Sequence, residues 1–311
     1  MLTTLNPTAD EVVDANAIIA IRQLTKEFEA GKPVLSNINL NIERGQVVGL
    51  LGQNGTGKTT LIKCLLGLLK RSGGDCTVYG EDSWDLSAET KAKLGYVAQD
   101  FAMMPWMTVA GMANYVGAFY ENWDYPYVES LIKDSGLEPD KRVGALSTGQ
   151  HQKLAVIAAL GHHPELLVLD EPVASLDPSA RRHFLQLLVE YTEDENRTVL
   201  FSTHITSDLE RIASHIVMLG KEDVIYQGEL DQLKSEVKRI RIRSQSNLPP
   251  ALGIADSVSQ SVDGKHAVVS VTKWNADQSR SLAQELNAEV SVEDLNLEDI
   301  FLELTNKRGE S

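Results

Sequence analysis

The hydrophobic residues of this chain fall into short runs whose spacing predicts alternating strands and helices. Residues 18–21 form an apolar run, and residues 38–42 alternate apolar and polar positions with period two, as a half-buried strand does. Residues 166–169 and 198–201 are almost wholly apolar, which is typical of parallel strands buried on both faces. Between these two runs, residues 179–191 place leucines and a valine on one face of a helix. This order of elements predicts an α/β fold with a parallel sheet.

Two further regions depart from this alternation. Residues 100–146 contain no run that would make a strand, so we expect a mostly helical insertion. Near Leu230 the pattern changes to short amphipathic segments. The elements expected there are strands at 238–243, 267–271 and 289–292 and helices at 277–286 and 299–304. We therefore predict a loose tail over residues 1–16, a large domain over residues 17–230 and a small α+β module over residues 231–311.

A glycine-rich segment between an apolar run and an expected helix carries the most specific chemistry. It fits the pattern G-x-x-x-x-G-K-[ST], the phosphate-binding loop of nucleoside triphosphatases. Its residues are Gly52, Gln53, Asn54, Gly55, Thr56, Gly57, Lys58, Thr59 and Thr60. The glycines let consecutive backbone N–H groups surround a phosphate, and the following helix adds its positive dipole end. Lys58 would contact the β- and γ-phosphates, and the Thr59 hydroxyl would coordinate Mg²⁺.

Two carboxylates directly follow the apolar run at residues 166–169. Asp170 would join the ligands of Mg²⁺, and Glu171 would hold and polarise the attacking water. Strands often end in acidic residues, so this pair is weak evidence by itself. Because it follows a phosphate-binding loop in the chain, it predicts a hydrolytic site.

Two single side chains follow the expected neighbouring strands. Gln99 stands at the hinge between a strand and the helical insertion, where it would coordinate Mg²⁺ and sense the γ-phosphate. His204 ends the strand beside the carboxylates, where we expect a contact with the γ-phosphate. A lone histidine at a strand end usually has a structural role, and only the surrounding pattern favours the functional one. We predict Lys58, Glu171 and His204 as the catalytic residues.

The segment Leu146–Gln150 precedes an apolar stretch that predicts a long helix. Ser147 fits the N-cap position and Gln150 the third helical position, and such a pair makes a capping box. One interpretation is a well-capped helix and nothing more. The other is that this helix start, with Thr148 and Gly149, contacts the γ-phosphate of a nucleotide bound elsewhere.

Composition and charge limit the possible partners. The chain has 311 residues, 42% of them hydrophobic and 23% charged, as in ordinary globular proteins. Its net charge of −15 disfavours a nucleic-acid partner, because a negative surface repels phosphate backbones. Cys64 and Cys76 are too few for a disulfide scaffold or a metal site, which favours reduced thiols. No run is long enough to span a bilayer and residues 1–15 lack the features of a signal peptide, so we expect a cytoplasmic protein.

Taken together, residues 18–230 resemble the ATP-binding-cassette (ABC) ATPases. The stretch Leu146–Gln150 looks like the signature motif that separates this family from other phosphate-loop enzymes. Residues 174–177 resemble the loop that crosses the family's dimer interface, which places Asp177 near a nucleotide, and Phe28 falls where an aromatic ring stacks on adenine. The resemblance implies a phosphate-loop fold with an antiparallel β subdomain and a helical subdomain.

The same resemblance implies ATP as the ligand and two cassettes packed head to tail, the second being a copy of this chain or a paralogue. Each ATP would lie between the phosphate loop of one cassette and the signature segment of the other. The sequence departs from the family pattern at four positions. Thr148 stands where glycine is usual and Lys153 where arginine is common. Phe28 replaces the commoner tyrosine, and Gly111 stands where glutamate is frequent in a region that docks the membrane partner.

Residues 296–305 look like the end of ATP-binding subunits from bacterial ABC-2-type exporters. This resemblance implies a peripheral protein at the inner face of the cell membrane that powers a multi-spanning permease. An apolar cluster fits either a partner interface or the core of the helical insertion. The cluster consists of Phe101, Met103, Met104, Trp106 and Met107. Two other functions stay open: a soluble cassette ATPase that acts on ribosomes or DNA, and an import ATPase.

Overall fold

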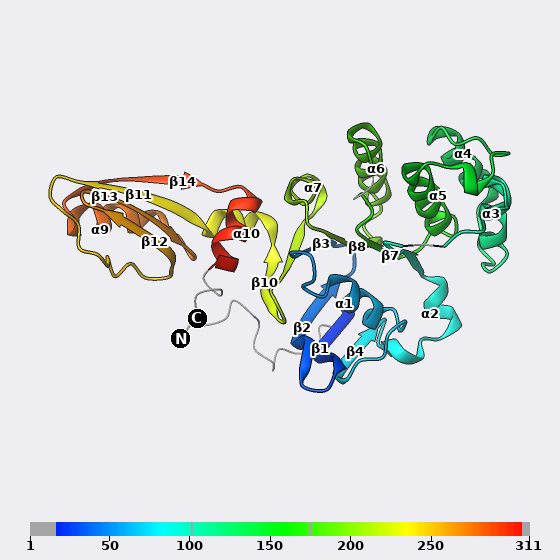
Figure 1. Cartoon of the computed structure of the whole chain (residues 1–311), viewed down its shortest axis with the longest axis horizontal. Coiled ribbons are helices and arrows are strands. Elements are labelled where there is room, and N and C mark those ends of the chain that lie inside the picture. Colours follow the sequence, from blue (N-terminus) through cyan, green and yellow to red (C-terminus); the bar gives the residue numbers. More distant parts are fainter. Residues whose placement is uncertain (1–16, 101, 174–175, 307–311) are drawn as a thin grey trace. The chain divides into compact units, whose positions relative to one another are not determined.

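The computed structural model describes residues 17–100, 102–173 and 176–306, which divide into two compact units between Gln227 and Gly228 (Figure 1). The predicted tail, Phe101 of the apolar cluster and residues 174–175 of the predicted interface loop lie outside the described residues. The division falls slightly before the boundary expected after Leu230, so helix α8 (Leu230–Glu236) lies wholly in the second unit.

A six-stranded sheet forms the centre of the first unit, with the strand order β10-β9-β3-β8-β7-β6. The strands are β3 (Val47–Leu51), β6 (Leu94–Val97), β7 (Leu166–Asp170), β8 (Thr198–Thr203), β9 (His215–Leu219) and β10 (Val224–Glu229). Strands β6, β7, β8, β3 and β9 pair in parallel, which confirms the predicted α/β fold. Every residue of β7 and β8 is buried, as in parallel strands covered on both faces. Helices α6 (Pro178–Tyr191) and α7 (Thr206–Ile212) follow these two strands.

An antiparallel sheet with the order β2-β1-β4-β5 forms a second layer of this unit (Figure 1). Its strands are β1 (Ala17–Glu29), β2 (Lys32–Glu43), β4 (Gly73–Val78) and β5 (Glu81–Asp82). Their apolar side chains share one hydrophobic core with α1 (Lys58–Leu65) and with the central sheet. The short helices η1 (Ser83–Asp85) and α2 (Ala88–Ala92) follow β5. Cys64 and Cys76 are free thiols within this core, and burial raises the pKa of Cys76 to about 11.

The predicted helical insertion is confirmed and has a hydrophobic core of its own. Its elements are α3 (Val109–Gly117), α4 (Tyr125–Asp134), η2 (Val143–Ala145) and α5 (Thr148–Leu160). The indole of Trp123 lies against Gly117 and Gly161, where an added Cβ would come within 2.6 Å and 2.5 Å of it. Thr108 and Asp124 cap α3 and α4 by accepting backbone N–H bonds. Gly117 and Gly161 thus leave room for the Trp123 ring, and the two caps stabilise the starts of α3 and α4.

A four-stranded antiparallel sheet with the order β12-β13-β11-β14 forms the second unit. Its elements after α8 are β11 (Lys238–Ser244), β12 (Ser257–Asp263), β13 (His266–Val271), α9 (Ala276–Glu285), β14 (Ala288–Asp294) and α10 (Leu297–Asn306). Its core is centred on Ile240, Ile242 and Val269. The three strands and two helices expected here are present, whereas β12 and α8 were not predicted. Among the described residues of both units, no helix has the length and apolar character needed to cross a bilayer.

Candidate active site

The glycine-rich loop connects β3 to α1 and owes its shape to three glycines. Gly55 and Gly57 have φ angles of 85° and 95°, in the left-handed region that favours glycine. A Cβ at Gly57 would also lie 2.8 Å from the Leu35 side chain, and a Cβ at Gly52 would lie 2.5 Å from the Thr56 hydroxyl. The loop therefore follows a path that side chains would block, and α1 begins directly after it.

The Lys58 side chain is folded back into this loop. Only 6% of it is exposed, and its Nζ donates to the carbonyl oxygens of Gly52 at 2.8 Å and Gln53 at 3.2 Å. The same Nζ lies 3.2 Å from Oε1 of Glu171. A charge removed this far from water needs a counter-charge, and Glu171 supplies it. A buried ion pair therefore joins the loop to the end of β7.

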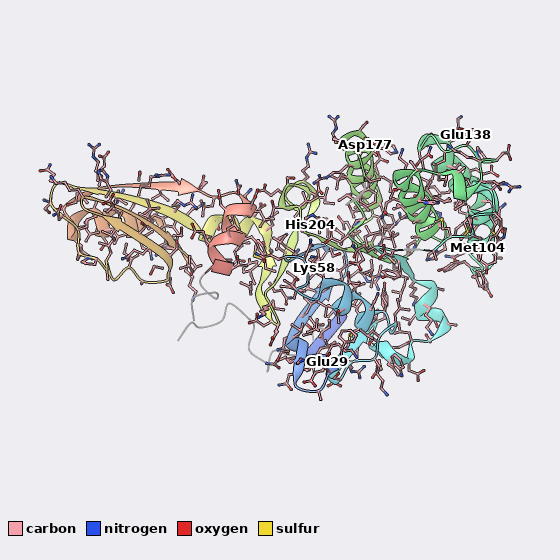
Figure 2. All side chains as sticks on the ribbon, viewed as in Figure 1. Glu29, Lys58, Met104, Glu138, Asp177 and His204 are labelled. Carbon is pink, nitrogen blue, oxygen red and sulfur yellow. The ribbon has the colours of Figure 1, made fainter. Side chains whose placement is uncertain are left out.

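A cleft of about 350 Å³ opens beside this ion pair, at the carboxyl ends of the central strands. It is lined by Val34, Asn54, Gly55, Gly57, Lys58, Thr59, Thr60, Gln99, Glu171 and His204. Segments far apart in sequence meet there because the carboxyl ends of parallel strands lie at one edge of a sheet. Figure 2 shows Lys58 and His204 near each other in this part of the unit. The structure thus gathers the loop, Gln99, Glu171 and His204, and their catalytic roles stay predictions.

The two carboxylates at the end of β7 have different surroundings. Asp170 is fully buried, its Oδ1 accepts a hydrogen bond of 2.7 Å from Ser202, and its Oδ2 has no partner within the described part of the chain. Glu171 has a φ of 51°, which is uncommon for a residue with a side chain. Its carboxylate contacts Lys58 and His204 at the wall of the cleft. Asp170 therefore has one buried carboxylate oxygen without a described partner, whereas Glu171 lines the cleft.

His204 follows β8 and lies against this glutamate. Its Nδ1 is 3.0 Å from Oε2 of Glu171, and 45% of the His204 side chain is exposed. The hydroxyl of Thr203 accepts the N–H of Ile205 at 3.0 Å, which stabilises the turn after the strand. The imidazole is thereby held beside Glu171 and stays accessible to a ligand in the cleft.

Ten predicted residues are not among those that line this cleft: Phe28, Gly52, Gln53, Thr56, Ser147, Thr148, Gly149, Gln150, Asp170 and Asp177. Phe28 is 63% exposed, and Lys26 Nζ lies 4.9 Å from its ring centroid. Ser147 Oγ accepts the N–H of Gln150 at 3.3 Å, and Oε1 of Gln150 accepts the N–H of Ser147 at 3.1 Å. The predicted capping box is therefore confirmed. Asp177 caps α6 and lies apart from the cleft residues labelled in Figure 2.

Ser202 contacts both acidic residues and was not predicted from the sequence. Besides its bond to Asp170, Ser202 Oγ accepts the backbone N–H of Glu171 at 2.9 Å. A serine inside an apolar strand gives little signal by itself. The available signal was its place two residues before His204, on the strand expected beside the carboxylates.

The apolar cluster after Gln99 divides between core and surface. Met103, Met104 and Met107 pack against the core of the helical insertion, whereas Trp106 is 67% exposed. Phe119, on the same insertion, is 72% exposed. The core interpretation therefore describes the three methionines, and the insertion presents the large aromatic side chains of Trp106 and Phe119 at its surface.

Known proteins share the features of this first unit. The model of the ABC transporter family matches residues 35–174. The ABC transporter ATP-binding protein NatA of Bacillus subtilis is 32% identical over 225 residues, which are 70% of this chain and 91% of the relative. The chain belongs to the ABC transporter ATP-binding proteins. It is therefore a member of a family of ATPases, as its motifs implied.

Other members of the family extend this comparison. A phosphonates import ATP-binding protein of Synechococcus sp. is 31% identical, over 71% of this chain and 88% of the relative. A solved dimeric bacterial ABC transporter cassette superposes with a TM-score of 0.62 at 25% identity, over 68% of this chain and 98% of that chain. The uncharacterized ABC transporter ATP-binding protein YdbJ of Bacillus subtilis is 28% identical over 303 residues, 95% of this chain and 98% of the relative. A relative thus exists that matches both units.

Proposed function

We propose that this ABC protein hydrolyses ATP to power a membrane exporter, and that two cassettes close on ATP in each cycle. The observation that carries the hydrolytic part is the contact of Glu171 with Lys58 and His204 at the wall of the cleft. A carboxylate in this position can orient a water molecule and accept its proton. Lys58 and the backbone N–H groups of the loop would bind the phosphates, and His204 would contact the γ-phosphate.

The residues around the cleft fit Mg²⁺. Thr59 and Gln99 line the cleft, and Asp170 keeps one buried oxygen without a partner among the described residues. Mg²⁺ prefers oxygen ligands of this kind and commonly takes the others from water and phosphates. The described residues contain no group of three or more His, Cys, Asp or Glu side chains that could hold a metal ion. When bound, Mg²⁺ neutralises charge on the β- and γ-phosphates.

A second cassette, either a copy or a paralogue, would complete each site. Ser147–Gln150 begin a helix away from this chain's own cleft, and a helix start can bind an anion brought by a partner. The solved dimer of a related cassette supports this pairing. Phe28 would stack on the adenine, and Asp177 would lie near the nucleotide at the dimer interface.

The transporter role adds a multi-spanning permease subunit as a partner. Exposed Trp106 and Phe119 on the helical insertion offer aromatic contacts of the kind enriched at protein interfaces. Export, and a location at the inner face of the cell membrane, rest on the resemblance of residues 296–305 to ABC-2-type exporters. One relative is named as an import protein, so the direction of transport is tested separately below.

Two variants separate ATP binding from turnover. Lys58→Ala should weaken ATP binding by about 10- to 100-fold, because it removes a charged donor to the phosphates. Glu171→Gln should bind ATP like the wild type and lower kcat by at least about 100-fold, because an amide is not a general base. Calorimetry and phosphate release measure the two effects. Wild-type turnover by Glu171→Gln would show that another group activates the water.

The same variant tests the partners. With saturating ATP, Glu171→Gln should form dimers in light scattering, whereas Ser147→Arg should bind ATP and remain monomeric. A Glu171→Gln protein that stays monomeric would favour a paralogue as the second cassette. Co-purification with a multi-spanning membrane protein would support the role in a transporter. ATP-dependent uptake of the transported compound into inside-out vesicles would support export. Co-purification with ribosomes or DNA, and with no such membrane protein, would contradict the transporter role.

A further inference from the structure

Ser202 lies at the end of β8, paired with Asp170 in the parallel register of β7 and β8. Both side chains are fully buried. The serine Oγ lies 2.7 Å from Asp170 Oδ1 and 2.9 Å from the backbone nitrogen of Glu171. One hydroxyl group therefore contacts the two consecutive acidic residues of the site.

The chemistry of the three groups determines the direction of each hydrogen bond. A backbone N–H can only donate, so Ser202 Oγ accepts from Glu171. The Ser202 hydroxyl then donates its hydrogen bond to Asp170, because a carboxylate can accept such a bond. The short distance is typical of a charge-assisted hydrogen bond. The Ser202 hydroxyl therefore acts both as a hydrogen-bond acceptor and as a hydrogen-bond donor.

Each bond restricts one of the acidic residues. Since Ser202 binds Oδ1 of Asp170, the other oxygen, Oδ2, is the one left to take a cation. The bond to the Glu171 N–H holds a residue whose φ is 51°, a conformation that persists only where its surroundings enforce it. In that conformation the Glu171 carboxylate reaches Lys58 and His204.

We propose that Ser202 is a positioning residue that prepares both carboxylates through one hydroxyl group. It orients the free oxygen of Asp170 toward the cation and maintains the backbone conformation that brings Glu171 to the cleft. The inference rests on the proposed ATPase function, because it concerns the preparation of the same site. Ser202 acts through its two neighbours and does not line the cleft.

The test uses the full chain with Ser202→Ala and with Mn²⁺ as the probe ion. In the presence of ADP, we expect Ser202→Ala to bind Mn²⁺ about 10-fold more weakly than the wild type. Electron paramagnetic resonance measures this affinity. We expect kcat to fall by about 10- to 100-fold with little change in KM. Binding of ATP in EDTA should stay at the wild-type value, because the contacts of Lys58 and the loop are not altered.

Thr198→Val is the matched control on the same strand. Thr198 is also fully buried, and its hydroxyl accepts the N–H of Gly45 at 2.9 Å, at the opposite end of β8. The variant loses a buried bond of the same kind and should keep the wild-type affinity for Mn²⁺. Ser202→Cys retains nearly the size of serine with a weaker donor, so it should give intermediate values. It also provides the measurement if Ser202→Ala does not fold.

The outcomes separate this inference from the proposed function. Wild-type Mn²⁺ affinity and kcat in Ser202→Ala would overturn the positioning role, and so would an equal loss in Thr198→Val. Glu171→Gln and Asp170→Asn are measured alongside. If these two variants retain turnover, the proposed ATPase mechanism fails. If they lose turnover while Ser202→Ala behaves like the wild type, only the role of Ser202 fails.

Discussion

The central sheet of the first unit and the sheet of the second unit bury their strands to different degrees. Every residue of β7 and β8 is buried, whereas β12 and β14 contain no buried residue. The parallel strands are covered on both faces, while the antiparallel sheet packs one face on its own core. The first arrangement offers strand ends where polar groups can be removed from water.

Charged side chains follow the same division. Asp170, Glu171 and Asp208 are buried in the first unit, whereas the ion pair of Arg241 and Glu293 in the second unit is exposed. Buried charges interact strongly with their neighbours and can stabilise charge that develops in a reaction. Exposed pairs are weakened by water and salt. The carboxylates named above in the first unit are removed from water and therefore need polar or charged partners.

The largest expected contrast concerns one ion pair from each unit. Arg181 Nη2 lies 2.6 Å from Asp208 Oδ2, and Asp208 is 2% exposed. Arg181→Met should destabilise the first unit by about 3–5 kcal/mol, because it leaves a buried carboxylate without its counter-charge. Arg241→Met is the matched control and should leave the second unit unchanged within error. Hydrogen exchange in urea measures the stability of each unit separately. Equal losses of stability from the two variants would contradict the expected difference between buried and exposed ion pairs.

Two fully buried valines test the same difference between the units through core packing. Val168 lies in β7 and Val269 in β13, and neither side chain is exposed. Each change to alanine removes two methyl groups from a core and should cost about 2 kcal/mol. We expect Val168→Ala to weaken hydrogen-exchange protection in the first unit and Val269→Ala only in the second. ATP affinity should stay at the wild-type value in Val269→Ala, and a loss there would mean that the second unit contributes to the site.

The smallest expected effect concerns the titration of His162. This ring is 1% exposed, stacks on Tyr120 with centroids 3.9 Å apart, and contacts the carbonyl oxygen of Leu94. Burial lowers its pKa from 6.5 to about 4. Between these two pH values the unfolded chain binds more protons than the folded one, so the first unit loses stability as the pH falls through this window.

His162→Phe keeps an aromatic ring and removes the titration. We therefore expect its free energy of unfolding to depend less on pH between 6.5 and 4 than that of the wild type. His266→Phe makes the same change at an exposed position of the second unit and serves as the control. An unaltered pH dependence in His162→Phe would mean that other groups cause the acid sensitivity of the first unit.

Most of the fold could be predicted because buried strands leave a local signal. β7 and β8 are apolar runs, and β11 alternates arginine with isoleucine. β12 was missed because residues 257–263 are mostly serine and polar residues and bury no side chain. The hydrogen bonds of β12 with β13 stabilise it, and hydrophobic periodicity does not report such pairing.

The site divides in the same way between local and non-local features. The phosphate-binding loop and the capping box each depend on a few consecutive residues, so their patterns were sufficient. The contacts of Ser202 depend on the register between β7 and β8, which no local pattern contains. The positive φ of Glu171 also requires neighbours that are distant in sequence.

The capping box gives Ser147 two duties. Its hydroxyl already holds the start of α5, and under the proposed function it also serves the ATP of a partner cassette. Two separate requirements then limit which residue types can occupy this position. Helix stability favours the few residues that cap a helix, because alanine in their place costs about 1 kcal/mol. An acidic cap would repel the phosphate of the partner's ATP. We therefore expect related proteins to carry small, neutral, polar residues at the position of Ser147.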